Sequence, residues 1–200
     1  IKAICVRGSR GIPIHDISVM IEKGKAMFRE CAENPETKIW QRCGTPGVTG
    51  WVNEIGAFPS YNFKNEWYVF HKNLLAEVMR EKIVVSDKSC FGCPMACGKY
   101  SHAKKEGKYD IYVEGPEYET IALCGGNCGF EDIADIAYAN WVCDNLGIDT
   151  ISTGGVIAFA IECFKKGIIT LEMTEGKNLE WGDTDSFSWL AEKIAKQVGI

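Results

Sequence analysis

The stretch DNLGIDTIS, residues 144–152, decides the fold, because it ends one long helix and begins another. Helical periodicity runs over residues 132–146, and Gly147 follows at the position where a left-handed residue would close the helix. Asp149 is a favourable N-cap for a second helix, which we expect to reach the region of Lys166. Two long helices joined by a short turn predict a body that is mainly α-helical.

Helical periodicity also dominates the rest of the chain. We expect further helices over residues 17–31, 45–55, 74–79, 118–123 and 185–198. Residues 2–8 form instead a short apolar run that ends at a glycine, which is typical of a β-strand. A single strand needs a partner, so we expect its sheet to lie upstream of residue 1. The predicted fold class is therefore mainly α, an irregular helical domain with a short N-terminal strand left from a β domain.

Composition and charge are those of a globular protein. Apolar residues make up 46% of the 200 residues and charged residues 24%, which allows a sizeable core. The formal net charge is −5 and no long basic run occurs, which argues against nucleic acid or an anionic membrane as a partner. No apolar run approaches the roughly 20 residues of a membrane span, and the first residues lack the pattern of a signal peptide. We therefore expect a cytoplasmic protein.

Three cysteines, Cys90, Cys93 and Cys97, lie within eight residues and are interleaved with glycines. Such spacing lets one loop present several thiolates, which are soft ligands suited to an iron–sulfur cluster or to zinc. A zinc site would usually bring a second pair of ligands at finger-like spacing, and no such pair follows. The loop therefore favours an iron–sulfur cluster over zinc or a redox-active loop. Its fourth ligand is Cys124, Cys128 or a cysteine outside this chain.

Four of the ten cysteines stand singly in apolar surroundings. They are Cys5, Cys31, Cys143 and Cys163. Free cysteine commonly behaves as a small buried hydrophobic residue, so we expect these four side chains to be structural.

Four motifs, in this order, resemble the aldehyde:ferredoxin oxidoreductase family. They are GTPG at residues 44–47, the cysteine loop, EGPEYET at residues 114–120 and DNLGIDTISTG at residues 144–154. The opening of the chain fits the same order, so the resemblance covers nearly the whole sequence. It implies an enzyme that oxidises an aldehyde to a carboxylate and passes the electrons to ferredoxin.

The resemblance also implies a cofactor and a domain organisation. Members of this family hold tungsten between two pterin dithiolenes beside a [4Fe–4S] cluster, and tungsten is preferred here to molybdenum on resemblance alone. Residues 1–10 would be the end of an N-terminal β domain that supports the cofactor, and residues 11–200 a helical domain of the family's type. The C-terminal domain would be absent from this chain. Cys90, Cys93 and Cys97 would be three cluster ligands, with the fourth in that last domain.

The family's pterin-binding loop corresponds to Asp144, Gly147, Ile148 and Asp149, with isoleucine in place of the usual leucine. Carboxylates at a junction between helices can accept hydrogen bonds from the pterin's N–H groups. Asp149 would serve equally as an ordinary N-cap, whereas Asp144, at a helix C-terminus, opposes the helix dipole and calls for another partner. Glu119 corresponds to an acidic residue near the metal, where a buried carboxyl could shuttle protons. Taken alone, it could be a helix-start carboxylate.

Two other functions stay open. One is the tungsten subunit of an aromatic acyl-CoA reductase, and the other is an iron–sulfur electron-transfer or structural module without tungsten. The implied partners are ferredoxin, a small aldehyde and the missing N- and C-terminal domains of the same enzyme. Some family members bind a metal at a dimer interface through a Glu-x-x-His pair, but residues 138–141 read YANW here. A homo-oligomer would therefore form without that metal site.

Overall fold

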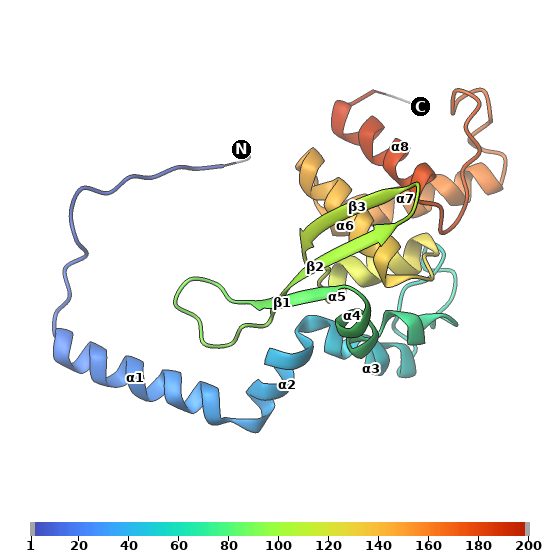
Figure 1. Cartoon of the computed structure of the whole chain (residues 1–200). Coiled ribbons are helices and arrows are strands. Elements are labelled where there is room, and N and C mark those ends of the chain that lie inside the picture. Colours follow the sequence, from blue (N-terminus) through green and yellow to red (C-terminus); the bar gives the residue numbers. More distant parts are fainter. Residues whose placement is uncertain (1–2, 199–200) are drawn as a thin grey trace.

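A computed structural model describes residues 3–198, in which a helical body carries a small sheet on one side and an N-terminal arm (Figure 1). The first elements of the body are α2 (Pro35–Cys43), η1 (Thr45–Val48), α3 (Thr49–Glu54), η2 (His71–Leu74) and α4 (Ala76–Lys82). The later helical elements are α5 (Tyr118–Thr120), η3 (Ile121–Gly125), η4 (Gly126–Cys128), α6 (Ile133–Leu146), α7 (Thr150–Lys165) and α8 (Thr184–Lys196). The mainly α fold class is confirmed.

The pair α6 and α7 forms as the sequence predicts. The Asp132 carboxylate accepts a hydrogen bond from the Ala134 N–H at 3.0 Å and caps the start of α6. Gly147 closes α6 in the left-handed conformation with φ 65°, where glycine incurs no steric cost. The two helices meet at 111°. Helix α7 ends at Lys165, and Gly167 follows it with φ 72°.

Among the described residues, no single helix is long and apolar enough to cross a membrane. The two helices α6 and α7 reach the length and apolar composition of a membrane span only when they are taken together, and they are sharply bent at their junction. Both helices have many side chains buried inside the body.

Helix α7 crosses closely over η3, a single π-helical turn that follows α5. A Cβ atom at Gly154 would lie 2.4 Å from the carbonyl oxygen of Leu123, so only glycine permits this approach. At the start of α7, the hydroxyls of Thr120 and Thr150 hydrogen-bond at 2.9 Å, and the Cys124 thiol donates to the Thr150 carbonyl at 3.1 Å. The backbones of η3 and α7 are thus held in register.

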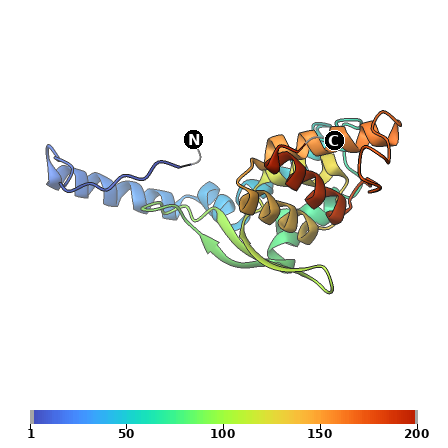
Figure 2. The same ribbon diagram turned by 90° about the horizontal axis from the view of Figure 1, so that it is seen from above.

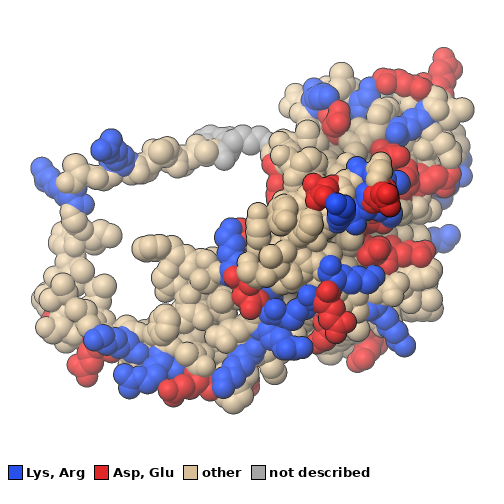
Figure 3. All heavy atoms as spheres, viewed as in Figure 1, with Lys and Arg blue, Asp and Glu red and all other residues tan. Residues whose placement is uncertain are grey.

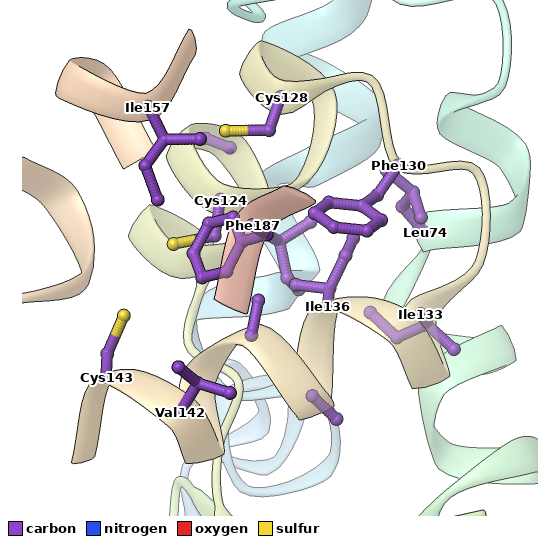
Figure 4. Packing of buried hydrophobic residues seen from close by; sticks show 14 of the residues in the cluster. Leu74, Cys124, Cys128, Phe130, Ile133, Ile136, Val142, Cys143, Ile157 and Phe187 are labelled. Carbon is purple, nitrogen blue, oxygen red and sulfur yellow. The ribbon is translucent and has the colours of Figure 1, made fainter. Parts of the chain in front are cut away.

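The core lies where α6, α7 and α8 converge on η3 and η4 (Figure 4). Its largest fully buried aliphatic side chains include Ile133, Ile136 and Ile157, and Phe187 reaches them from α8. Cys143 and Cys163 are buried as expected. The expectation for Cys5 and Cys31 was wrong, because Cys5 is exposed and Cys31 only partly covered in the N-terminal arm.

An antiparallel three-stranded sheet interrupts the helical chain and was not expected. It consists of β1 (Val84–Lys88), β2 (Gly98–Lys105) and β3 (Tyr109–Glu114), in the order β1-β2-β3. Strands β2 and β3 pack against α6. The side chains of β3 alternate strictly between buried and exposed, which is the period of a half-buried strand. The sequence signal for this sheet was the alternation of apolar and polar residues in β3, together with Gly107 at the tip of the β2–β3 hairpin.

The N-terminal arm consists of residues 3–16 and α1 (Ile17–Glu33), and it stands away from the body in both views (Figures 1 and 2). The strand expected from residue 2 does not form over residues 3–8, where the chain has no ladder partner. Lys2 lies outside the described residues. Helix α1 has no buried residue, and Met27 and Phe28 on its apolar face are 69% and 55% exposed.

The face of the body seen in Figure 3 carries basic and acidic side chains intermixed. The surface ion pairs of the protein include Lys104 with Asp110 at 2.8 Å. No single sign of charge dominates that face.

We predict that Gly154→Ala and Gly155→Ala have opposite effects on stability. The Cβ atom at residue 154 would meet the backbone of Leu123 and Cys124, which cannot move without shifting η3, so we expect a loss of about 2 kcal/mol or more. The Cβ atom at residue 155 would meet nothing within 4 Å, so alanine should stabilise the helix by about 0.5–1 kcal/mol. Denaturant unfolding of both variants measures the difference. Equal effects would contradict the close packing of α7 on η3.

Candidate functional site

The turn between α6 and α7 presents Gly147, Ile148 and Asp149 together at the surface. An open hollow of about 330 Å³ lies beside it, lined by Gly147, Ile148, Asp149, Ser152, Thr153, Val156 and Ile194. The Asp149 carboxylate accepts a hydrogen bond from the Ser152 N–H at 2.7 Å. This bond to the helix backbone holds the pKa of Asp149 below its usual value. Asp149 is therefore an N-cap that also borders a hollow.

Asp144 lies at the C-terminal end of α6 and faces the end of β3. Its carboxylate accepts a hydrogen bond from the Asn140 amide at 3.0 Å. Desolvation, together with the negative charge of Glu114, raises the pKa of Asp144 above its usual value. A carboxylate in this setting favours an added hydrogen-bond donor or cation. Asn140 is the side-chain donor to Asp144, and a second donor would further stabilise the charged carboxylate.

Glu119 lies on the short helix α5 and is exposed, so it is not enclosed by this chain. Its neighbour Thr120 hydrogen-bonds Thr150, the residue that follows Asp149. The backbone of Glu119 is therefore tied to the α6–α7 turn, although its side chain does not line the hollow there.

Two further motifs meet through Thr45. Its hydroxyl hydrogen-bonds the Glu117 carboxylate and accepts a bond from the Tyr118 N–H at 2.9 Å. Next to it, Gly44 passes so close to the cysteine loop that a Cβ atom there would lie 2.6 Å from the Cys97 carbonyl oxygen. Residues 44–45 thus bridge the cysteine loop and the segment that leads into α5.

The cysteine loop projects from the ends of β1 and β2 on the side of the molecule where α1 lies (Figure 1). Cys90 and Cys93 are exposed and Cys97 is partly covered. The Cys93 sulfur accepts a bond from the Met95 N–H at 3.4 Å, an interaction that would also suit a thiolate ligand. Among the described residues, no three His, Cys, Asp or Glu side chains converge as a ready metal site. The donor set fits a cluster, but the three sulfurs are not gathered.

Cys124 and Cys128, considered above as a fourth ligand, lie in the core rather than at the loop (Figure 4). Cys124 donates to the Thr150 carbonyl, and Cys128 donates to the Gly154 carbonyl at 3.3 Å. Burial raises the pKa of the Cys128 thiol far above its usual value. For Cys124, a bond to Cys143 and burial raise the pKa as well. Both are therefore structural thiols of the core and not ligands at the loop.

The YANW segment, residues 138–141, packs against β3 and α8 and is buried or partly buried. The Tyr138 ring stacks on Tyr109 of β3 with centroids 4.5 Å apart, and the Trp141 ring lies 5.9 Å away. The Tyr138 hydroxyl accepts a bond from Ser188 of α8 at 3.2 Å. Aromatic packing and this hydrogen bond thus join α6 to β3 and α8.

Residues 22–200 match a family model described as "Aldehyde ferredoxin oxidoreductase, domains 2 & 3". The tungsten-containing aldehyde ferredoxin oxidoreductase of Pyrococcus furiosus is 35% identical over 202 residues, which cover 100% of this chain and 33% of that protein. The enzyme of the same description from Thermococcus kodakarensis is 34% identical over 197 residues, which cover 98% of this chain and 32% of that protein.

A more distant relative is described as the WOR-like subunit of an aliphatic sulfonate oxidoreductase from Pyrococcus furiosus. It is 28% identical over 203 residues, which cover 100% of this chain and 32% of that protein. The chain thus spans about a third of the length of the relatives that it matches.

We predict that Asp149→Ala lowers the stability at neutral pH by about 1 kcal/mol, because α7 loses its N-cap. The folded pKa of Asp149 is depressed, so its contribution is present above the unfolded value, near 3.8, and is lost as the pH falls through the folded pKa. The difference from the unsubstituted protein should therefore shrink below about pH 3.8 in denaturant titrations. Asp149→Asn, which retains a capping oxygen, should cost only a few tenths of a kcal/mol at all pH values. A cost that does not change with pH in the alanine variant would refute the ionised cap.

Proposed function

Because this chain belongs to the aldehyde ferredoxin oxidoreductase family, we propose that it is part of a tungstopterin and [4Fe–4S] enzyme that oxidises small aldehydes to carboxylic acids. In that reaction water supplies the added oxygen, the aldehyde and the water together release two protons and two electrons, and the electrons go to ferredoxin. We place the reaction in the cytoplasm. The family is one of oxidoreductases. Our proposal adds the specific reaction, the electron acceptor and the cellular compartment.

The observation that carries the proposal is an unbroken series of contacts from the cysteine loop to the α6–α7 turn. Gly44 touches the Cys97 carbonyl, and Thr45 bonds the segment that enters α5. At the far end of α5, Thr120 bonds Thr150 beside Asp149. The four motifs are far apart in sequence, yet they form one connected structure. A site for a cluster next to an organic cofactor needs such a connection.

Cys90, Cys93 and Cys97 would hold three corners of the cluster, and a thiolate from the rest of the polypeptide would hold the fourth. Thiolates on a loop with an N–H···S bond fit an iron–sulfur cluster, which supplies one-electron transfer when bound. The loop has its sulfurs apart in this chain. We infer that the loop closes when the cluster binds.

Asp144 and Asp149 would accept hydrogen bonds from pterin N–H groups, and Gly147 and Ile148 would line the floor of that contact. Charge-assisted bonds of this kind are stronger than bonds between neutral groups. The negative charge of Glu114 near Asp144 would favour the binding of an added donor, because a donor offsets the repulsion between the two carboxylates. The hollow at Asp149 is open, so it can receive part of a larger ligand.

Glu119 would accept a proton released during aldehyde oxidation at one of its carboxylate oxygens. It is exposed in this chain, so the protein parts that enclose it would come from the rest of the polypeptide. The same applies to the apolar face of α1, with Met27 and Phe28 uncovered. We propose that residues 1–10 are the end of an N-terminal β domain, that α1 lies against this domain, and that a C-terminal domain covers the site.

Anaerobic purification of the full-length polypeptide, followed by native mass spectrometry and metal analysis, tests the proposal. We expect tungsten, two pterins and four irons in one polypeptide, with aldehyde-dependent reduction of ferredoxin. Iron without tungsten or pterin would favour an electron-transfer module instead. Activity that requires a coenzyme A thioester would favour the acyl-CoA reductase.

We predict that Asp149→Asn lowers the tungsten content of the full-length enzyme while the iron content is retained. The amide still caps α7 but offers a neutral oxygen to the pterin, so cofactor affinity should fall roughly 10-fold. Asp183→Asn is the matched control, because Asp183 caps α8 in the same way, accepting from the Ser186 N–H at 2.8 Å. Equal tungsten in the two variants, measured by elemental analysis per polypeptide, would exclude the pterin contact of Asp149.

A further inference from the structure

Lys99 is a buried cation directly behind the cysteine loop. Its side chain is 3% exposed, although lysine is among the residues least often buried. The ammonium donates to the carbonyls of Gln41 at 2.8 Å and Cys97 at 2.9 Å, and more distantly to Ala96 and Gly98, both at 3.3 Å. No sequence pattern indicated this residue.

These carbonyls make the ammonium a point of attachment for the loop. Three of them belong to consecutive residues, 96–98, and the backbone must curl for all three to face one nitrogen. Ala96 adopts the left-handed conformation with φ 46° within this curl, which is unfavourable for a residue with a side chain. The bonds to Lys99 offset that cost. The fourth carbonyl, of Gln41 in α2, ties the curl to the helical body.

The carbonyl of Cys97 is also confined from its other side. Gly44 leaves no room there for a Cβ atom, which would come within 2.6 Å of that oxygen. In addition, the Gln41 side-chain amide donates to the Pro94 carbonyl at 3.2 Å. The second half of the loop is therefore anchored, whereas Cys90 and Cys93 lie on its exposed half. Of the three cysteines of the loop, Cys97 is the one whose carbonyl is held by Lys99 and packed against Gly44.

The positive charge of Lys99 is only partly neutralised. Among residues 3–198, its carboxylate partner is Asp87, at 3.2 Å, and Asp87 is shared with Arg80 at 2.6 Å. Lys99, Arg80 and Asp87, two cations and one carboxylate, together carry a net positive charge. A cluster held by four thiolates is anionic, and a nearby positive charge favours the reduced, more negative state.

We propose that Lys99 is a positioning residue for the iron–sulfur cluster, which both fixes the Cys97 half of the loop and raises the reduction potential of the cluster. This inference rests on the proposed function, because it needs a cluster on Cys90, Cys93 and Cys97. Lys99 would bind no iron itself. It would have two separable effects, one on the retention of the cluster and one on the reduction potential of the cluster.

The test uses the full-length polypeptide purified without oxygen, with the variants Lys99→Met, Asp87→Asn and Lys104→Met. Lys104 lies on the same strand but is exposed and pairs with Asp110, so its variant is the control for loss of a charge. The two readouts are the rate of iron release to a chelator and the midpoint potential of the cluster followed by electron paramagnetic resonance.

We expect Lys99→Met to release iron roughly 10-fold faster, in line with the loss of a residue that supports a metal ligand. The cluster that remains should have a lower potential. Asp87→Asn removes a negative charge from the same place, so it should shift the potential upward. Lys104→Met should change neither readout. Shifts of opposite sign in the first two variants cannot come from general loss of folding.

Unchanged iron release and potential in Lys99→Met would overturn the inference and leave the proposed function standing. If Lys99→Met does not fold, a potential in Asp87→Asn that is unchanged or lowered overturns it equally. No iron in the unsubstituted protein would overturn the proposed function and the inference together. The three results are distinct, so each failure can be assigned.

Discussion

The contact between Gly154 of α7 and the backbone of Leu123 is the constraint on which the rest of the structure depends. It brings the π-turn η3 against α7 with no side chain between them. Because η3 follows directly on α5, the same contact sets the position of Glu119 and of the EGPEYET segment relative to the α6–α7 turn. It also encloses Cys124, whose thiol bonds the first turn of α7. A π-turn is rare in helices and is frequent at functional sites, which fits its place here.

Helix α2 (Pro35–Cys43) was not expected, whereas the helices of the α6–α7 corner were predictable because their ends carry local signals. Asp132, Gly147 and Asp149 define the α6–α7 corner through capping interactions that involve only neighbouring residues. The same holds for Asp16 at the start of α1 and Asp183 at the start of α8. The order of the four motifs was predictable for another reason, since it rests on resemblance to a family, and the family is confirmed.

Features that depend on distant partners were not predictable. The sheet was missed because β1 and β2 are separated by the cysteine loop, and the alternation of β3 is only six residues long. A strand was expected at residues 2–8 from local composition. It does not form over the described residues 3–8, because a strand is stable only when it pairs with another strand. Lys99 and the bridge made by Thr45 depend on contacts across tens of residues. Patterns within a single sequence do not show which distant residues come into contact.

The capping bond of Asp149 has a consequence for ligand selection. A free aspartate side chain samples several rotamers, and a ligand that captures it must offset the entropy of choosing one. Here folding has already made that choice, because the Ser152 N–H holds the carboxylate in place. In the pterin contact proposed above, the turn would therefore act as a rigid template that selects ligands by the direction of their N–H groups.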